Sequence, residues 1–352
     1  MRLSHQLVVH SAFNKPGDVV HWLGAVQAQD YPAALWGIGM RTRGATARSI
    51  EQAIAEKKIV RTWPMRGTLH FVSPQDVRWM LAHLTARKVA GAASRFRNLR
   101  LDGATFMRSE KILYKALEGK HRLTRDALYT LLERNHISCA GQRGIHILWR
   151  LAQEQLICFG PREGNQHTFV LFDEWIPPTS LLSRDEALNE LALRFFNSHG
   201  PATIKDFAWW SGLSLREAKA SIKSAASDLD NVTIDDEQYW MPRKQAVASS
   251  NGNEAHFLPA FDEYLVSYKD RSFAVKPRYA KRMHPGGGIL NPTIVCDGRI
   301  VGTWKRSIHN HTVEVHIHPF GRMGKTERSC IEQASERYGM FLGKEIVLRI
   351  NR

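Results

Sequence analysis

The sequence predicts an α+β protein with three tandem winged-helix (helix-turn-helix) domains followed by a small C-terminal β-barrel. Two observations favour this architecture. Three helical segments followed by two short strand-like segments recur within residues 1–248, and the pattern then changes to strands. Three helices followed by a two-stranded hairpin is the order of elements in a winged helix. We therefore expect four domains, at residues 1–100, 101–178, 179–248 and 249–352.

The second domain carries the clearest copy of this unit. An amphipathic segment ends at Gly119, and Thr124 is a natural N-cap for the helix that follows. A third helix is expected at residues 142–155. Two strands complete the unit, at residues 156–159 and 168–171.

The third domain contains a helix-turn-helix signature after a first helix at residues 187–197. Thr203 caps one helix, Gly212 provides the turn, and Ser214 caps the next helix. That second helix is expected at residues 215–226. A short wing follows, at residues 232–234 and 238–241.

The first domain is the weakest copy. Its expected helices cover residues 3–13, 18–26 and 47–56, and its strands cover residues 59–63 and 68–72. Residues 74–100 then resemble a helical connector.

The C-terminal region begins after a polar linker near residues 249–253. Asp297-Gly298 is a tight hairpin signal between two apolar runs. One helix, at about residues 326–342, interrupts the strands. The strands expected to form the barrel are at residues 264–266, 294–296, 300–304, 313–317 and 346–348.

The charge of the chain indicates a polyanionic partner. Lys and Arg number 49 against 34 acidic residues, a formal net charge of +15. Residues 77–101 carry basic side chains and no acid, and residues 265–306 carry many bases and only two acids. A strongly basic chain with clustered cations is typical of nucleic-acid binders. An acidic membrane surface would attract the same charges, but no strongly apolar amphipathic helix accompanies them.

Composition and motifs exclude several other classes. No apolar run approaches the ~20 residues of a membrane span, and the N-terminus lacks the apolar core of a secretory signal. The four scattered cysteines favour a reducing cytoplasm and argue against a zinc finger. His309-Asn310-His311 and His316-Ile317-His318 would suit a metal, DNA or a plain barrel surface. We expect no metal and no cofactor.

The segment Gln27-Ala28-Gln29-Asp30 is the most informative part of the chain. It closes an apolar helical run, and Pro32 disfavours helix at Tyr31. Residues two apart do not share a helix face, but they share a side of an extended backbone. Two neutral amides would then point into one site at a helix end. Ordinary exposed glutamines would give the same pattern.

Four motifs in order carry a more specific resemblance. The first is Gln27-Ala28-Gln29-Asp30, and the others follow it along nearly the whole chain. The other three motifs are Arg61-Thr62-Trp63-Pro64-Met65-Arg66-Gly67-Thr68-Leu69-His70, Pro259-Ala260-Phe261-Asp262-Glu263-Tyr264 and Val301-Gly302-Thr303-Trp304. In this order the four motifs resemble the AlkZ/YcaQ family of bacterial DNA glycosylases, which combine tandem winged helices with a C-terminal β-barrel.

The resemblance implies a monofunctional hydrolase that excises cationic N-alkylated purines, with interstrand crosslinks as a further substrate. Gln27 and Gln29 match the catalytic element of the family. Amide oxygens accept hydrogen bonds and present a negative dipole, but they are not general bases near neutral pH. Supporting roles are expected for Asp30, Trp63 and His70, although a packed strand histidine would equally explain His70.

Double-stranded DNA, alkylated or crosslinked, is the expected partner of a cytoplasmic, nucleoid-associated monomer. Arg66 lies in a hairpin turn and is a phosphate candidate. The other candidates come from the wing, the second domain and the basic C-terminal region. The expected DNA-binding residues are Arg66, Thr68, Arg143, Arg150, Lys269, Arg271, Arg278, Lys281, Arg282, Lys305 and Arg306.

A different class of protein shares the charge and the helix-turn-helix units. A winged-helix transcriptional regulator would bind one sequence, usually as a dimer on a palindrome, and would not require the amide pair. A nonenzymatic sensor of damaged DNA is the third hypothesis. Excision of a damaged base separates both from the glycosylase.

Overall fold

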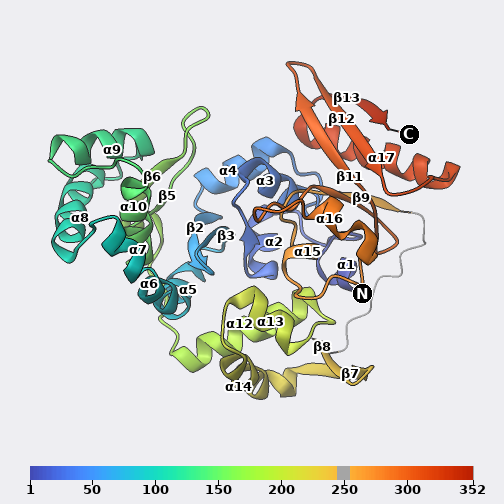
Figure 1. Ribbon diagram of the computed structural model, residues 1–352, viewed down its shortest axis with the longest axis horizontal. Coiled ribbons are helices and arrows are strands. Elements are labelled where there is room, and N and C mark those ends of the chain that lie inside the picture. The colour runs from blue at the N-terminus through green and yellow to red at the C-terminus, as the bar shows by residue number, and fades with distance from the viewer. Residues whose placement is uncertain (244–253, 352) are drawn as a thin grey trace. The chain divides into compact units, whose positions relative to one another are not determined.

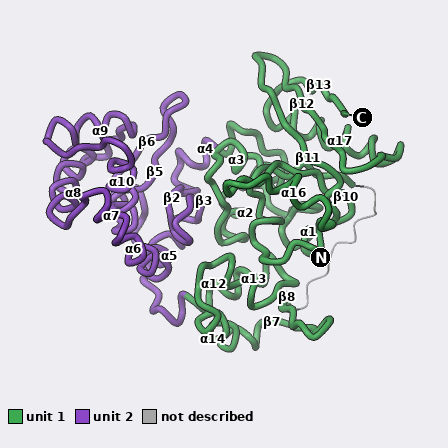
Figure 2. Tube along the Cα trace, in the orientation of Figure 1, with its two compact units in different colours: residues 1–50, 188–352 green, residues 51–187 purple. Residues whose placement is uncertain are grey.

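The computed structural model describes residues 1–243 and 254–351, and its chain forms α-helices and β-strands in two compact units (Figures 1 and 2). Unit 1 comprises residues 1–50 and 188–352, and unit 2 comprises residues 51–187. The α+β class is as expected. The four sequential domains stay a prediction, and the linker expected near residues 249–253 lies outside the described residues.

Unit 2 is built around an antiparallel sheet in the order β3-β2-β5-β6-β4. Both hairpins expected from the sequence are present, and the connector is helical. The strands are β2 (Val60–Met65), β3 (Thr68–Val72), β4 (Leu123–Thr124), β5 (Ile157–Phe159) and β6 (Thr168–Leu171). The helices are α5 (Val77–Leu84), α6 (Ala86–Gly91), α7 (Ala93–Asn98), α8 (Gly103–Leu117), α9 (Arg125–Arg134), α10 (Arg143–Gln153) and α11 (Phe172–Trp175).

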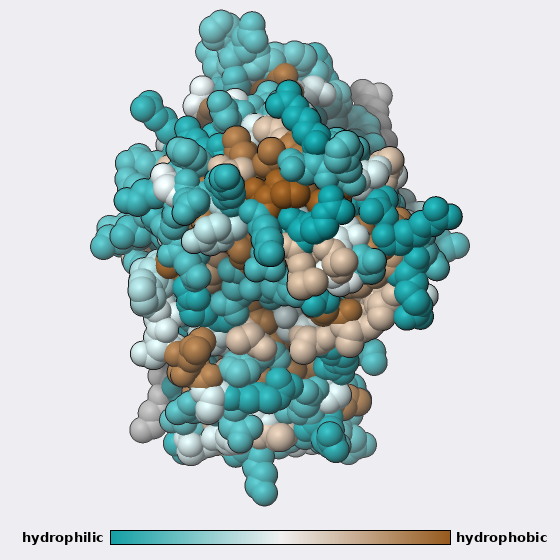
Figure 3. Space-filling view, turned by 90° about the vertical axis from the view of Figure 1, so that its left-hand side faces the viewer, coloured by the Kyte–Doolittle hydropathy of each residue, from teal (hydrophilic) through white to brown (hydrophobic). Residues whose placement is uncertain are grey.

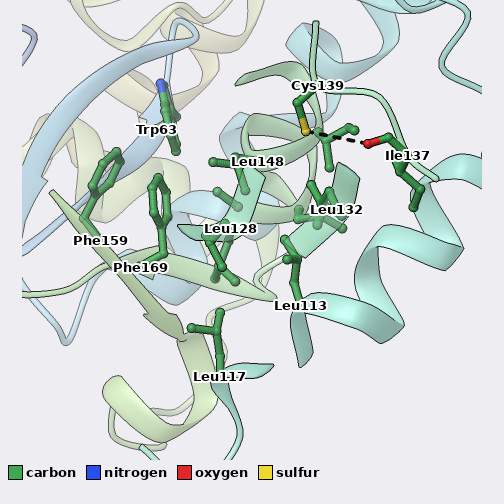
Figure 4. Packing of buried hydrophobic residues seen from close by; sticks show 14 of the residues in the cluster. Trp63, Leu113, Leu117, Leu128, Leu132, Ile137, Cys139, Leu148, Phe159 and Phe169 are labelled. Carbon is green, nitrogen blue, oxygen red and sulfur yellow. Dashed lines mark hydrogen bonds between the residues drawn. The ribbon is translucent and has the colours of Figure 1, made fainter. Parts of the chain in front are cut away.

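The core of unit 2 forms where helices α8, α9 and α10 pack against the sheet (Figure 4). Leu113 and Leu117 on α8, and Leu128 and Leu132 on α9, are each four residues apart, so each pair lies on one helix face. The Thr124 side chain accepts the Ala127 amide hydrogen and caps α9, as its position predicted.

Unit 1 contains the helix-turn-helix and the C-terminal sheet. Its first helices are α1 (Arg2–His5), α2 (Pro16–Leu23) and α3 (Tyr31–Gly39), with β1 (Val26–Gln27) between α2 and α3. The boundaries between the units fall within α4 (Ala47–Ala55) and α12 (Arg184–His199). The next elements of unit 1 are α13 (Ile204–Ser211) and α14 (Leu215–Ala225), followed by β7 (Leu229–Ile234) and β8 (Glu237–Pro242). The C-terminal elements are β9 (Ala255–Leu258), α15 (Glu263–Val266), α16 (Ala280–Met283), β10 (Thr293–Cys296), β11 (Arg299–Ile308), β12 (Thr312–Pro319), α17 (Lys325–Leu342) and β13 (Glu345–Ile350).

The helix-turn-helix of unit 1 follows its sequence signals closely. Thr203 and Ser214 each begin a helix with a reciprocal capping box, and Gly212 takes a left-handed conformation with φ 75° between them. Trp210 on α13 is fully buried. The antiparallel hairpin of β7 and β8 completes the expected order of elements.

The C-terminal strands form an open five-stranded sheet in the order β13-β12-β11-β10-β9. Its pairs are antiparallel except β12 with β13, which α17 connects while packing against β9 and β13. Asp297 and Gly298 have positive φ angles of 47° and 78° and form the expected tight hairpin. Among the described residues β9 and β13 remain edges, so closure into a barrel is not confirmed.

Several expected elements are wrong, each for a local reason. Residues 264–266 form helix α15 and not a strand, because the Asp262 carboxylate accepts the Tyr264 amide hydrogen and caps a helical turn. Helix α3 starts at Tyr31 although Pro32 follows, because proline is tolerated in a first turn.

Two more differences concern the N-terminal region. Helix α1 ends at His5, well before the expected end at residue 13. Helix α2 ends at Leu23, three residues before the expected position, because Gly24 has φ 76°.

A buried ion pair ties the N-terminal part of unit 1 to α15. The Arg41 guanidinium contacts both Asp262 carboxylate oxygens at 2.8 Å, and each side chain is 1% exposed. The remaining Arg41 donors reach the carbonyl oxygens of Gln6 and Gly37 at 2.8 Å.

Asp262→Ala should lower the free energy of unfolding by about 3–5 kcal/mol, because it leaves a buried guanidinium without its counter-charge. Urea unfolding followed by circular dichroism measures the loss. A loss below about 1 kcal/mol, the scale of an exposed ion pair, would contradict the buried pair.

Candidate functional site

The two glutamines of unit 1 lie on an extended segment between α2 and α3. Val26 and Ala28 are 5% and 0% exposed, whereas Gln27 is half-buried and Gln29 is exposed. Because side chains alternate on extended backbone, the two amides occupy the accessible side while the apolar pair faces the core. Because α2 ends at Gly24, the residues that follow can adopt this extended backbone.

Asp30 has a structural task next to the amides. One of its carboxylate oxygens accepts the Ala33 amide hydrogen at 3.1 Å and caps α3. Gln29 therefore stands immediately before the N-terminus of this helix, where backbone N–H groups carry partial positive charge. Asp30 is exposed, so capping leaves its carboxylate accessible to solvent.

The backbone of Gln27 is held by a buried carboxylate. Glu263, 1% exposed, accepts the Gln27 amide hydrogen on Oε1 at 2.8 Å. Its Oε2 accepts the Ser267 hydroxyl at 2.6 Å and the Trp210 indole Nε1–H at 3.2 Å. His199 Nε2 lies 3.7 Å from the same oxygen.

These partners decide the charge of the Glu263 side chain. Burial alone raises the pKa of a carboxyl group. Here His199, the Ser267 hydroxyl and the Gln27 amide stabilise the anion more strongly, and together they lower the pKa of Glu263 to about 2. Glu263 is therefore a buried anion at neutral pH, in contact with the segment that carries the amides.

A second layer of hydrogen bonds supports this arrangement. Gln6 is fully buried and donates from Nε2 to the Tyr268 hydroxyl at 3.0 Å. Tyr268 in turn donates to the His199 carbonyl oxygen at 2.6 Å. The His199 ring stacks on Phe195 with centroids 4.9 Å apart and planes 11° apart. The side chains around Glu263 are thus fixed by packing and by hydrogen bonds.

The candidate residues of the first wing lie in unit 2. Trp63 is a core residue that packs against Phe159 with ring centroids 5.1 Å apart. His70 is fully buried, and its Nε2 accepts from Arg66 at 2.9 Å while its Nδ1 donates to the Thr68 carbonyl at 2.9 Å. One neutral tautomer satisfies both contacts. This turn is therefore internally braced, with Arg66 at φ 56°.

Two further candidates in unit 2 are engaged within the protein. Arg143 donates to the carbonyl oxygens of Ser138 and Arg100 at 2.9 and 2.8 Å. Arg150 forms an ion pair with Glu154 on the next turn of α10. Both side chains therefore stabilise the local structure, a role that the sequence pattern did not indicate.

The basic residues of the C-terminal region differ in accessibility. Arg271 is half-buried and donates to the Leu265 carbonyl at 2.6 Å, and Arg306 donates to the Tyr338 hydroxyl. Trp209 is 47% exposed. Of the residues expected to bind DNA, Lys269, Arg278, Lys281, Arg282 and Lys305 are exposed, although Arg282 also donates to the Pro319 carbonyl oxygen at 3.1 Å.

Over residues 1–243 and 254–351, no three His, Cys, Asp or Glu side chains gather as a metal site, the His-x-His pairs included. None of the helices described there is long and apolar enough to cross a membrane. The face drawn in Figure 3 is dominated by hydrophilic residues.

Glu263 is the residue that sequence reasoning missed. It belongs to the motif Pro259-Ala260-Phe261-Asp262-Glu263-Tyr264, so the resemblance included it. A single glutamate belongs to no periodic pattern, and apart from Ser267 its hydrogen-bond partners, Gln27 and Trp210, lie far away in sequence. Only the folded unit brings it to Gln27.

Comparison with known proteins gives the class to which this α+β protein belongs. The family model described as DNA glycosylase AlkZ-like matches residues 20–341. The chain belongs to this family of DNA glycosylases, as the four motifs indicated.

Two relatives support this assignment. The interstrand DNA cross-link repair glycosylase of Streptomyces sahachiroi is 26% identical over 333 residues, covering 86% of this chain and 85% of that protein. The solved structure of the Streptomyces sahachiroi DNA glycosylase AlkZ matches with a TM-score of 0.80 at 23% identity, covering 99% of this chain and 97% of that one. The latter shows a shared fold.

The ionised Glu263 should make stability depend on pH. A carboxyl whose folded pKa lies below its unfolded value stabilises the fold above the unfolded pKa, and this contribution disappears as the pH falls through the folded pKa. The contribution of Glu263 should therefore decline between pH 4.5 and about 2. Urea unfolding at a series of acidic pH values measures it.

The matched comparison is Glu263→Gln, which removes the titrating group. This variant should be less stable at neutral pH and should lose less stability on acidification than the unaltered protein. Parallel pH profiles for the two proteins would show that Glu263 does not carry the effect.

Proposed function

We propose that this DNA glycosylase hydrolyses the N-glycosidic bond of cationic N-alkylated purines in double-stranded DNA and leaves an abasic site. The observation that carries the proposal is the extended segment between α2 and α3, on which Gln27 and Gln29 are accessible while Val26 and Ala28 are buried. Two amides on one side of a held backbone are suited to a reaction that needs positioning and dipoles more than acid catalysis.

The chemistry explains why amides suffice. An N7-alkylated purine already carries positive charge, so its glycosidic bond breaks without protonation of the leaving base. The enzyme then has to hold a water molecule at the sugar and stabilise the developing oxocarbenium charge. The Gln27 and Gln29 carbonyl oxygens accept a hydrogen bond from that water and direct a negative dipole at the sugar. The proposed substrates are therefore limited to lesions that already carry positive charge and are activated for cleavage.

Asp30 has a secondary place in this scheme. Its carboxylate caps α3 and is exposed beside Gln29. Capping fixes the start of α3 and so limits the movement of Gln29. A direct role as general base is the less favoured assignment, because the cap already engages one carboxylate oxygen.

Crosslink repair is the further substrate that we propose. The Streptomyces sahachiroi relative is named an interstrand DNA cross-link repair glycosylase. A base tethered to the opposite strand cannot rotate fully into a closed pocket, which is the usual route of glycosylases. Half-exposed Gln27 and exposed Gln29 suit a base that remains close to the duplex.

DNA binding would rely on the accessible cations. We propose that Lys269, Arg278, Lys281, Arg282 and Lys305 contact phosphates, as residues exposed on a chain of net charge +15. Arg66, Arg143, Arg150, Arg271 and Arg306 would act mainly by shaping the protein surface, because they are half-buried as well as donating to protein groups. Thr68 would brace the His70 turn.

The finer architecture is also part of the proposal. The capped helices α13 and α14 with the β7–β8 hairpin have the element order of a winged helix, and so do α8, α9, α10 with β5 and β6. We place the working enzyme, as a monomer, at the bacterial nucleoid, where its substrate is. Family membership sets aside the regulator hypothesis, since the family consists of glycosylases.

Gln27→Ala or Gln29→Ala should lower excision of N7-methylguanine from a duplex by about 10- to 1000-fold, the range for losing one positioned transition-state dipole. DNA affinity should hardly change, because the amides act on the transition state. Single-turnover release of the base measures the rate, and the product should be an intact abasic strand.

Two outcomes would count against this assignment. Unaltered excision by the Gln27→Ala/Gln29→Ala double variant would remove the catalytic role. Substantial borohydride trapping of a protein–DNA adduct would contradict the hydrolytic mechanism, because the motif contains no lysine to form a Schiff base.

Affinity for undamaged duplex should be nearly independent of sequence and should fall steeply with salt, with a log–log slope of about −0.9 per neutralised phosphate. Lys269→Ala combined with Lys281→Ala should flatten the slope by about two units, with no change in base preference. Fluorescence anisotropy over a range of salt concentrations measures both quantities.

The control is Lys205→Ala, compared with each single variant Lys269→Ala and Lys281→Ala, because it also removes one positive charge, but from a lysine already paired with Glu237 at 2.7 Å. It should leave the slope almost unchanged. Enrichment of one palindrome roughly a thousandfold or more in a selection from random duplexes would instead restore the regulator hypothesis.

A further inference from the structure

One buried charge contacts the segment that presents the amides. Glu263 lies on α15, far from Gln27 in sequence, and its Oε1 accepts the Gln27 backbone N–H at 2.8 Å. The carboxylate is 1% exposed, and its other oxygen is occupied by Ser267 and Trp210. A buried charge is costly unless it is paired and hydrogen-bonded, so this arrangement is specific.

We propose that Glu263 is a positioning residue for the glycosylase reaction, because its carboxylate fixes the β1 backbone and thereby the direction of the Gln27 and Gln29 side chains. The inference rests on the catalytic role proposed above for the two glutamines. Glu263 itself would touch neither water nor substrate.

The segment needs such an anchor for a physical reason. Strand β1 has only two residues, and Gly24, just before it, adopts φ 76° without the restraint of a side chain. A hydrogen bond to an ionised acceptor is roughly twice as strong as a neutral one. Displacing a reacting group by about 1 Å can cost about 100-fold in rate.

The Glu263 carboxylate is itself held in place by neighbouring side chains. The Trp210 ring packs on Phe195 with centroids 5.0 Å apart, and His199 stacks on the same ring. Ser267 lies one helical turn from Glu263 and donates its hydroxyl at 2.6 Å. The contacts to Oε2 thus fix the orientation of the carboxylate, so that Oε1 faces the backbone of β1.

Two substitutions distinguish the effect of the length of the Glu263 side chain from the effect of its charge. Glu263→Asp keeps the carboxylate but shortens the side chain by one carbon, so the 2.8 Å contact to Gln27 is lost. Glu263→Gln keeps the length but removes the charge. Each should lower single-turnover excision of N7-methylguanine by about 10- to 100-fold, the range expected for a misplaced reacting group. Affinity for the damaged duplex should change little.

Asp262→Asn is the matched control, because it makes the same acid-to-amide change on the adjacent buried residue. Asp262 pairs with Arg41 and caps α15, and these contacts do not involve β1. Asparagine also caps helices. This variant should lose stability while keeping the excision rate, measured at a temperature where circular dichroism shows every variant folded.

A double-mutant cycle distinguishes positioning from general destabilisation. If Glu263 acts through Gln27, the combined loss of Gln27→Ala with Glu263→Asp should be smaller than the product of the two single losses. A purely structural role would give multiplicative losses.

The outcomes separate this inference from the proposed function. Full activity of folded Glu263→Asp and Glu263→Gln, or multiplicative losses in the cycle, would overturn the positioning role while leaving the glutamines in place. Full activity of Gln27→Ala and Gln29→Ala would overturn the catalytic assignment itself. Slow Glu263 variants with a normally active Asp262→Asn would support both.

Discussion

Two buried carboxylates at the start of α15 determine how remote segments of unit 1 pack together. Asp262 neutralises Arg41, and Glu263 receives the Gln27 amide, the Ser267 hydroxyl and the Trp210 indole. Neither charge would be tolerated in the interior without these partners, since the desolvation of an ion amounts to several kcal/mol. The contacts therefore impose one arrangement on segments that are remote in sequence.

This constraint connects stability to chemistry. The arginine and its carbonyl acceptors fix the N-terminal segment, while the glutamate fixes the strand that carries the amides. Amides are weak catalysts individually, and their value lies in an orientation that is set before the substrate arrives. In the function proposed above, such groups would suffice for bases already activated by alkylation, provided that the backbone beneath them does not move.

The charge of the chain serves a different purpose. Cations on the C-terminal region are partly accessible and partly committed to carbonyl oxygens and hydroxyl groups of the protein. Accessible ones suit phosphate binding, which is strong, salt-dependent and indifferent to sequence. Cations that are already hydrogen-bonded within the protein, such as Arg271 in this region and Arg143 in unit 2, stabilise the backbone around them. Net charge thus overstates the number of side chains available to DNA.

Local signals in the sequence determined much of this protein. Caps at Thr124, Thr203 and Ser214, the turn at Gly212 and the Asp297-Gly298 hairpin were predictable, because each depends on residues within a few positions of one another. The four ordered motifs were sufficient for the family. The placement of Gln27 and Gln29 on one side was predicted for an extended backbone, but the spacing alone did not distinguish it from ordinary exposed glutamines.

Tertiary structure decided what local rules left open. Residues 264–266 are strongly apolar and β-like, yet the Asp262 cap makes them helical, and β9 had no clear signal at all. The C-terminal strands were found, but whether a sheet closes depends on pairing between its edges, which no strand encodes by itself. Glu263 was invisible as a partner of Gln27 because 236 residues separate them. The role of a buried charge depends on the groups that folding brings into contact with it, and these cannot be identified from the neighbouring sequence.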